Sequence, residues 1–232
     1  MVDRPESIAS GLESPHRHAN AVTVFERAAI IFDMDGTLLD SVDAVPGAYV
    51  AAVMEVQRQS IDPQEVIANY PLGPTATILS ALLGRESTLA DLDVYHRCLK
   101  RNLKRVRPYP GIEEAVAELA SRLPIAVFTG ADRKAAQLLL DHTGLLEALT
   151  LVVGGDEVAR PKPAPDGILL TCRRLGVQPG AAAYVGDAPS DLLAARAAGV
   201  VAIAAAWGHQ FDPTVPADEV AASPQDLLAT LS

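Results

Sequence analysis

The chain has 232 residues, of which 49% are hydrophobic and 21% are charged, so it can bury a substantial core and is not disordered throughout. Its formal net charge of −10 argues against nucleic acid or an anionic membrane as a partner, because both require clustered lysine and arginine. Cys98 and Cys172 are the two cysteines, and their wide spacing predicts neither a disulfide framework nor a structural zinc site.

Residues 1–24 are polar, contain proline and glycine and show no periodicity, so we expect a flexible tail. No apolar run approaches the roughly 20 residues that span a bilayer, and the first residues lack the apolar stretch of a signal peptide. We therefore expect a cytoplasmic protein. Short apolar runs that predict buried strands recur along the rest of the chain, at 28–32, 125–129, 149–153, 182–185 and 200–204.

Helical patterns separate these strands, for example the apolar stripe between Ile112 and Leu123. Alternation of strand and helix predicts a mainly parallel sheet covered on both faces. The segment from about 42 to 107 interrupts this alternation with helical periodicity and is interpreted as a helical insertion. Its helices are expected near 43–58, 74–83 and 88–105. A short closing helix is expected after Ser223-Pro224.

Two acidic residues follow the first predicted strand directly, in the segment Asp33-Met34-Asp35-Gly36-Thr37. Because alternate side chains of an extended chain point the same way, Asp33 and Asp35 can face one crevice before Gly36 turns the chain. Two carboxylates held so close favour a hard divalent cation such as Mg2+, which leaves one carboxylate free to attack phosphorus. The alternative is an Asp-Gly turn whose acids accept hydrogen bonds from local backbone amides.

A second acidic pair, Asp187 and Asp191, comes directly after the strand at 182–185. Gly186 precedes the pair and permits close approach of the backbone. The alternative interpretation is that Asp191 or Ser190 caps the helix that follows, and a cap and a metal ligand can coexist.

Two further candidates lie in loops after predicted strands. Lys162 stands in Arg160-Pro161-Lys162-Pro163-Ala164-Pro165-Asp166, where prolines stiffen the loop and hold the ammonium in a place that suits a phosphate. The alternative is a solvated loop lysine. Thr129 ends the strand at 125–129 before Gly130, and it offers a hydroxyl and exposed amides to an oxyanion.

In this order, the segment Asp33–Thr37, Thr129, Lys162 and the pair Asp187 and Asp191 resemble the four motifs of the haloacid dehalogenase-like hydrolase superfamily. The resemblance covers about residues 28–208. It implies an α/β fold with a Rossmann-like three-layer core, and it assigns the insertion to the superfamily's subclass with a helical cap. The expected domains are a tail at 1–24, a catalytic core at 25–42 and 108–232, and a helical cap at 43–107.

The resemblance also implies a role for each motif residue of a Mg2+-dependent phosphatase. Asp33 would become an aspartyl-phosphate, and Asp35 would act as general acid and then general base. Thr129, Gly130 and Lys162 would bind the phosphoryl oxygens. The Mg2+ ligands would be the Asp33 side chain, the Asp35 backbone carbonyl, Asp187 and Asp191. Gly130 stands where members with this cap often carry asparagine, so a side-chain contact to the substrate is expected to be missing.

Three other functions are alternatives to the phosphatase, and each has different residue requirements. A haloacid dehalogenase would generally lack an acid at the Asp35 position. A β-phosphoglucomutase-like sugar-phosphate mutase usually has a histidine early in its cap, whereas residues 41–52 contain none. A non-enzymatic binding module would be expected to have lost Asp33 or Asp35.

The cap and one core segment bear on the substrate. Tyr70–Thr75 is a candidate specificity loop, because its Gly and Pro can project backbone amides toward the cleft. Ala206-Trp207-Gly208 is similar to a segment common in phosphoglycolate phosphatases and their pyrophosphatase relatives. We therefore expect a small phosphate monoester, phosphoglycolate-like or a sugar phosphate, as the partner, with no nucleic acid and no membrane. A monomer or a homodimer is expected.

Overall fold

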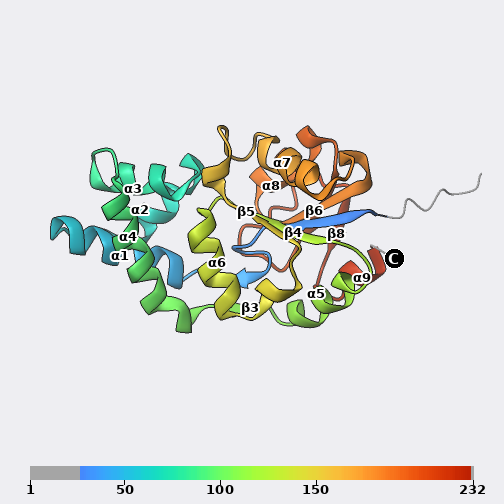
Figure 1. Ribbon diagram of the computed structural model, residues 1–232, viewed down its shortest axis with the longest axis horizontal. Helices are drawn as coiled ribbons and strands as arrows, with labels where there is room; N and C mark the ends of the chain where they lie inside the picture. Colours follow the sequence, from blue (N-terminus) through green and yellow to red (C-terminus); the bar gives the residue numbers. More distant parts are fainter. Residues whose placement is uncertain (1–26, 231–232) are drawn as a thin grey trace, which may run out of the picture.

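A computed structural model describes residues 27–230, and its centre is a six-stranded sheet in the order β5-β4-β1-β6-β7-β8 (Figure 1). Every neighbouring pair of strands in this sheet is parallel. The predicted α/β fold class is therefore confirmed, while the predicted tail at 1–24 lies outside the described residues. The strands are β1 (Ala29–Phe32), β4 (Ile125–Phe128), β5 (Leu151–Val153), β6 (Ala182–Gly186), β7 (Val201–Ala205) and β8 (Glu219–Ala221).

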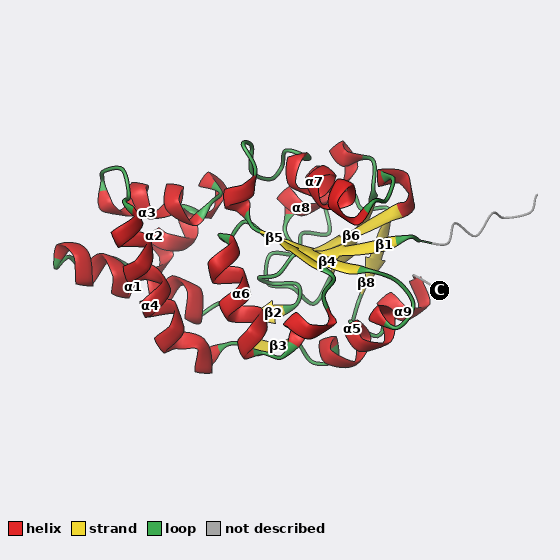
Figure 2. Ribbon diagram, viewed as in Figure 1, coloured by secondary structure: helices red, strands yellow, loops and turns green. Residues whose placement is uncertain are grey.

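Helices cover both faces of the sheet (Figure 2). Ile31 of β1 packs in an apolar cluster with Ile168 of α7 and Leu192 of α8, on one face. Its neighbour Phe32 packs in the other cluster, which contains Leu139 of α6. Successive strand residues point to opposite faces, so the continuous apolar runs of the strands supply both clusters. The covering helices are α5 (Ile112–Ala120), α6 (Arg133–His142), α7 (Asp166–Leu175), α8 (Pro189–Ala198) and α9 (Asp226–Thr230).

The order of the strands reverses at β1. After β1 the chain forms β4 and β5 on one side, and afterwards β6, β7 and β8 on the other. Open parallel sheets bind ligands outside the carboxyl ends of their strands at such a switch point. Asp33, Thr129 and Asp187 directly follow β1, β4 and β6, so the fold places the loops that carry them at this edge.

Helices α1 to α4 pack together at one end of the molecule, beyond α6 (Figure 1), and we call residues 44–105 the helical unit. The chain enters and leaves this unit side by side, because β2 (Leu39–Asp40) pairs antiparallel with β3 (Arg107–Pro108). Domain boundaries at 42/43 and 107/108 stay a prediction, which this pairing supports. The helices of the unit are α1 (Ala44–Gln57), α2 (Pro63–Ala68), α3 (Thr75–Leu83) and α4 (Leu89–Asn102), with short 3-10 turns at Tyr70–Leu72 and Leu103–Arg105.

Several short elements are not predicted by the sequence patterns. Helix α2 has one buried residue, Val66, and β8 is an edge strand that begins with Glu219, so neither shows a periodicity that could be recognised. Further short 3-10 turns lie at Leu145–Ala148, Gly155–Glu157 and Pro179–Ala181. Within residues 27–230, no helix is both long and apolar enough to cross a membrane.

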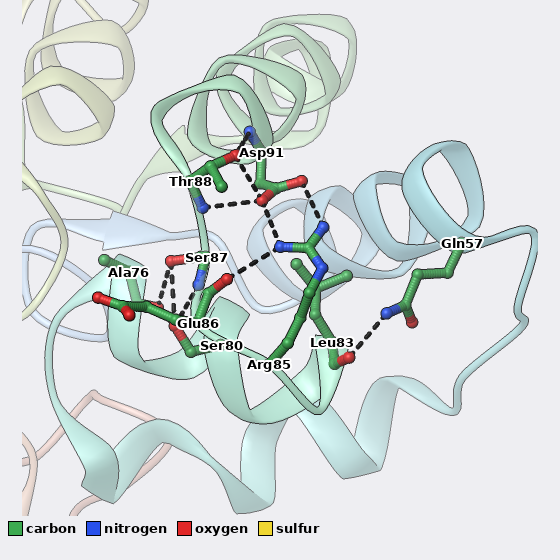
Figure 3. A network of polar contacts seen from close by, with 9 residues as sticks. All are labelled: Gln57, Ala76, Ser80, Leu83, Arg85, Glu86, Ser87, Thr88 and Asp91. Atoms are coloured by element: carbon green, nitrogen blue, oxygen red, sulfur yellow. Dashed lines mark hydrogen bonds and ion pairs between the residues drawn. The ribbon is translucent and has the colours of Figure 1, made fainter.

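Asp91 fastens the start of α4 to the loop that precedes it (Figure 3). Its Oδ2 accepts hydrogen bonds from the backbone N–H and the hydroxyl of Thr88, at 2.8 and 2.7 Å. Thr88 Oγ1 in turn accepts from the Asp91 N–H, which completes a capping box. The guanidinium of Arg85 donates to both carboxylate oxygens, at 2.7 and 2.9 Å. Arg85 and Thr88 together hold the pKa of Asp91 well below its usual range.

Asp91→Ala is expected to lower the free energy of unfolding by about 1–2 kcal/mol at pH 7, because it removes the carboxylate that accepts from the Thr88 N–H and from Arg85 at the start of α4. A lowered pKa in the folded state means that this contribution is present above about pH 4 and is lost as the pH falls further. Urea unfolding at pH 7 and at pH 2.5 measures this contribution, and the difference in unfolding free energy from wild type should shrink at the lower pH. Asp91→Asn keeps an acceptor for the Thr88 N–H, so its free energy of unfolding should lie between those of wild type and Asp91→Ala. An undiminished difference at pH 2.5 would refute the role of the charge.

Candidate active site

Asp33 stands at the end of the central strand. Its backbone N–H donates to the Val185 carbonyl at 2.8 Å, which extends the pairing of β1 with β6 by one residue. The residue is 5% exposed. Burial raises the pKa of Asp33 well above its usual value, in spite of the nearby Lys162 ammonium. Asp33 is therefore a desolvated carboxyl group that needs positive charge nearby to remain ionised.

Lys162 joins two of the candidate acids. Its Nζ lies 2.6 Å from Asp33 Oδ1 and 2.6 Å from Asp191 Oδ1. Although burial alone would lower it, Asp191 and Asp33 raise the pKa of Lys162 well above its usual value, so this side chain is charged at neutral pH. The alternative of a solvated loop lysine is excluded, because the side chain is only 13% exposed.

Asp187 and Asp191 are held by the loop after β6 and by two neighbouring segments. Asp187 accepts hydrogen bonds from the Gln210 N–H at 3.0 Å and from the Thr37 hydroxyl at 3.3 Å. Asp191 Oδ2 accepts from the Ala188 N–H at 3.0 Å at the start of α8, while its Oδ1 faces Lys162. Asp191 thus serves as the predicted cap and as a member of the acid cluster at once.

Two glycines allow the loops to close around Asp187. Gly36 has a φ of +88°, and a Cβ added to it would lie 2.4 Å from Asp187 Oδ2. A Cβ on Gly208 would lie 2.2 Å from Asp187 Cβ. Both distances are far below van der Waals contact, so a side chain at either position would displace the carboxylate.

The carboxylate oxygens of Asp33, Asp187 and Asp191 can all lie within 4.8 Å of one another, and the three residues are the one such group among residues 27–230. Three buried carboxylates face one ammonium, that of Lys162, so negative charge is in excess. Burial, with a smaller contribution from the Asp191 charge, raises the pKa of Asp187 to about 6. Oxygen donors of this charge and spacing fit a divalent metal ion. The Asp35 side chain is not in this group, and a role for its backbone carbonyl as a ligand stays a prediction.

Asp35 occupies a different environment from Asp33. Its side chain accepts a hydrogen bond from the Ser41 hydroxyl and is only partly buried. Burial raises the pKa of Asp35, although Ser41 and Lys162 oppose the shift. A carboxyl group with a raised pKa holds a proton more readily near neutral pH, as a general acid must. Burial raises the pKa of both acids of the first motif, but their partners differ: Asp33 faces the Lys162 ammonium and Asp35 faces the Ser41 hydroxyl.

Thr129 and Gly130 form the loop after β4, next to β1 in the sheet. Thr129 is buried, its N–H donates to the Val153 carbonyl at 3.1 Å, and its hydroxyl accepts from the Ala131 N–H at 3.2 Å. A Cβ added to Gly130 would have no atom within 4 Å. The space on the Cβ side of Gly130 is therefore open, and the role of Gly130 in binding phosphate stays a prediction.

Two residues outside the sequence motifs also contact the site, Tyr184 and Gln210. The Tyr184 hydroxyl donates to the Phe128 carbonyl at 2.9 Å and lies 3.4 Å from Lys162 Nζ. A single polar group within the apolar strand β6 is the signal that could have revealed Tyr184. Gln210 acts through its backbone N–H, which no side-chain pattern can reveal.

A parallel α/β sheet with a lysine and three buried aspartates at its switch point defines an enzyme that handles an anionic group. A family model described as haloacid dehalogenase-like hydrolase matches residues 30–205. The chain therefore belongs to the haloacid dehalogenase-like hydrolase family, and the predicted resemblance is confirmed. It is a phosphatase of this family.

Relatives with known names cover most of the chain. A phosphoglycolate phosphatase of Chromobacterium violaceum is 32% identical over 199 residues, which are 82% of this chain and 90% of the relative. The fructose-1-phosphate phosphatase YqaB of Escherichia coli is 37% identical over 188 residues, 78% of this chain and 97% of the relative. The crystal structure of CbbY from Rhodobacter sphaeroides in complex with phosphate superposes with a TM-score of 0.76 at 23% identity, covering 88% of this chain and 99% of CbbY, which shows a common fold.

Proposed function

We propose that this phosphatase hydrolyses a small phosphate monoester, phosphoglycolate-like or a sugar phosphate, through an aspartyl-phosphate on Asp33 with Mg2+ as cofactor. One observation carries the proposal: Asp33 is a buried carboxylate at the end of the central strand, with Oδ1 held by Lys162 at 2.6 Å. A fixed carboxylate beside a cation can attack an anionic phosphoryl group. Relatives named phosphoglycolate phosphatase and fructose-1-phosphate phosphatase support the substrate class.

In the proposed first step, an Asp33 oxygen forms a bond to phosphorus while the bond between phosphorus and the ester oxygen breaks. Asp35 donates a proton to the departing oxygen and later accepts one from the water that attacks the aspartyl-phosphate. The raised pKa of Asp35 supports the role of proton donor. The products are an alcohol, inorganic phosphate and the free Asp33 carboxylate.

Positive and polar groups of the chain would stabilise the transferring phosphoryl group. Lys162, the Thr129 hydroxyl and the backbone at Gly130 would donate to its oxygens as charge develops. The residues that would hold Mg2+ are Asp33, Asp35, Asp187 and Asp191. Bound there, Mg2+ would offset the excess negative charge of the carboxylates and of the phosphate.

The helical unit would act as the cap predicted at 43–107 and exclude bulk water from the site. The candidate specificity loop supports this role. A Cβ added to Gly73, within Tyr70–Thr75, would lie 2.6 Å from Pro161 Cβ, so this loop touches the segment that carries Lys162. The cytoplasmic location and the monomeric or homodimeric state stay predictions.

A sugar-phosphate mutase remains the alternative function. Residues 41–52 contain no histidine for the proton transfers expected of a mutase. Ser41, at the start of this segment, instead donates to Asp35. A panel of phosphoglycolate, sugar phosphates, nucleotides, pyrophosphate and a haloacid separates the candidates. Phosphate release identifies a phosphatase, isomerised sugar phosphate a mutase and chloride a dehalogenase.

Removal of metal with EDTA is expected to lower hydrolysis of para-nitrophenyl phosphate by at least about a hundredfold, and excess Mg2+ should restore it. Asp187→Asn should raise the Mg2+ concentration needed for half-maximal activity, because it removes one charged ligand. Glu118→Gln, at an exposed acid of α5 outside the cluster of Asp33, Asp187 and Asp191, should leave this Mg2+ concentration unchanged. Equal activity with EDTA and with Mg2+ would contradict the metal-dependent mechanism.

A further inference from the structure

A buried hydrogen-bonded pair of polar side chains lies where the helical unit meets the core. His96 Nε2, on α4, is 2.9 and 3.0 Å from the two carboxylate oxygens of Asp132. His96 is 8% exposed and Asp132 is 7% exposed. Although burial alone would raise it, His96 and the Ala135 N–H hold the pKa of Asp132 below its usual value. The Asp132 carboxylate is therefore ionised at neutral pH and accepts a hydrogen bond from the imidazole Nε2–H.

Asp132 belongs to the loop that carries Thr129 and Gly130. Its Oδ1 accepts from the Ala135 N–H at 2.9 Å, so Asp132 is also the N-cap of α6. Its backbone N–H donates to Thr75 Oγ1, in the helical unit, at 3.0 Å. Two residues of the helical unit thus bind opposite ends of one aspartate in the loop after β4. Movement of the unit away from the core would break both contacts.

The energetics of the pair favour a reversible contact. His96 Nδ1 is buried and has no hydrogen-bond partner among residues 27–230, which is a cost that an apolar side chain would not carry. On separation Nδ1 would gain water, and that gain would partly offset the loss of the bond to Asp132. An exposed ion pair, Lys134 with Asp93, links the same two helices at 3.0 Å. Exposed pairs contribute little, whereas removal of one partner of a buried pair leaves the other without its hydrogen bond, so the larger effect is expected at the buried pair.

We propose that His96 and Asp132 are positioning residues of the phosphatase reaction. Their bond holds the helical unit against the core in the closed state and thereby fixes the loop that presents Thr129 and Gly130 to the phosphoryl group. This role rests on the proposed function of that loop. In this role His96 does not contact the substrate.

The role predicts a change in KM with little change in kcat. If His96→Leu lowers the fraction of closed, binding-competent protein about tenfold, the apparent affinity falls by the same factor, so KM should rise about tenfold while kcat stays within about threefold. His96→Gln, whose amide nitrogen can replace Nε2, should restore most of the affinity. His96→Asn is polar but too short to reach Asp132 and should behave like His96→Leu. Asp132→Asn keeps an N-cap for α6, loses the charged acceptor and should also raise KM.

The matched control is Asp93→Asn, which removes the exposed ion pair between the same helices and should leave KM unchanged. Hydrogen exchange of substrate-free protein gives a readout that does not depend on activity. Exchange at 129–135 should be faster in His96→Leu and His96→Asn than in wild type, His96→Gln and Asp93→Asn. If KM and exchange in His96→Asn equal those of Asp93→Asn, the positioning role is wrong. Wild-type protein without Mg2+-dependent activity would instead contradict the proposed function, and the exchange comparison would still test the contact.

Discussion

Asp33→Asn is expected to reduce phosphatase turnover by at least about a thousandfold, with the protein still folded. The amide has nearly the shape of the carboxylate but cannot form the acyl-phosphate bond. Asp35, Lys162 and Thr129 would remain in place, and saturating Mg2+ would offset the loss of one metal ligand, so the remaining loss of turnover would report the nucleophile. Turnover of para-nitrophenyl phosphate in saturating Mg2+ measures it. Acid-quenched wild-type protein should carry a covalent phosphate detectable by mass spectrometry, and the variant should carry none.

The same substitution should leave the metal-free protein as stable as wild type or more stable. Burial raises the pKa of Asp33, which means that the fold disfavours the charge that asparagine removes. Lys162 keeps its second partner, Asp191, at 2.6 Å. Asp40→Asn, at an exposed acid in β2, is the control and should retain full activity. Phosphate-transfer activity in Asp33→Asn comparable to that of Asp40→Asn would show that Asp33 is not the nucleophile.

The sheet could be predicted because its strands are continuous apolar runs between helices. Five of the six strands lie within one or two residues of the predicted ranges, among them Ile125–Phe128 and Leu151–Val153. β8 could not be predicted, because Glu219 and Val220 are largely outside the core and their pairing depends on β7. Helix α4 ends at Asn102, short of the predicted 105, since the last turn tightens to a 3-10 turn.

The candidate site was predictable as a set of residues but not as a set of contacts. Asp33 follows one strand, and the segment with Asp187 and Asp191 follows another. This position was enough to predict that the three residues lie close together. The sequence could not show that Lys162 bridges two of them, because that contact depends on the fold of a loop. His96 and Asp132 were not singled out as a pair, since 36 positions separate them and neither belongs to a motif. Their approach results from the packing of α4 against the start of α6.

Lys162→Met is expected to lower both stability and activity. Methionine replaces the apolar stem of the side chain but leaves Asp33 and Asp191 buried without their shared ammonium. Breaking a buried ion pair in this way costs about 3–5 kcal/mol of unfolding free energy, measurable by urea denaturation in the absence of metal. Turnover should fall by at least about a hundredfold, because a donor to the transferring phosphoryl group is lost.

A double-variant cycle separates this cost from simple loss of packing. If unpaired negative charge is the cause, Lys162→Met combined with Asp33→Asn should be more stable than Lys162→Met alone, because the second change removes one of the stranded carboxylates. Mg2+ should also stabilise Lys162→Met more than it stabilises wild type, since the cation takes over neutralisation that the ammonium provided. Equal stability of Lys162→Met and wild type, or no coupling in the cycle, would contradict the proposal that Lys162 neutralises the buried carboxylates. Opposite effects of Asp33→Asn and Lys162→Met on stability would instead show that the site carries excess negative charge, which the phosphatase offsets with Lys162 and its metal.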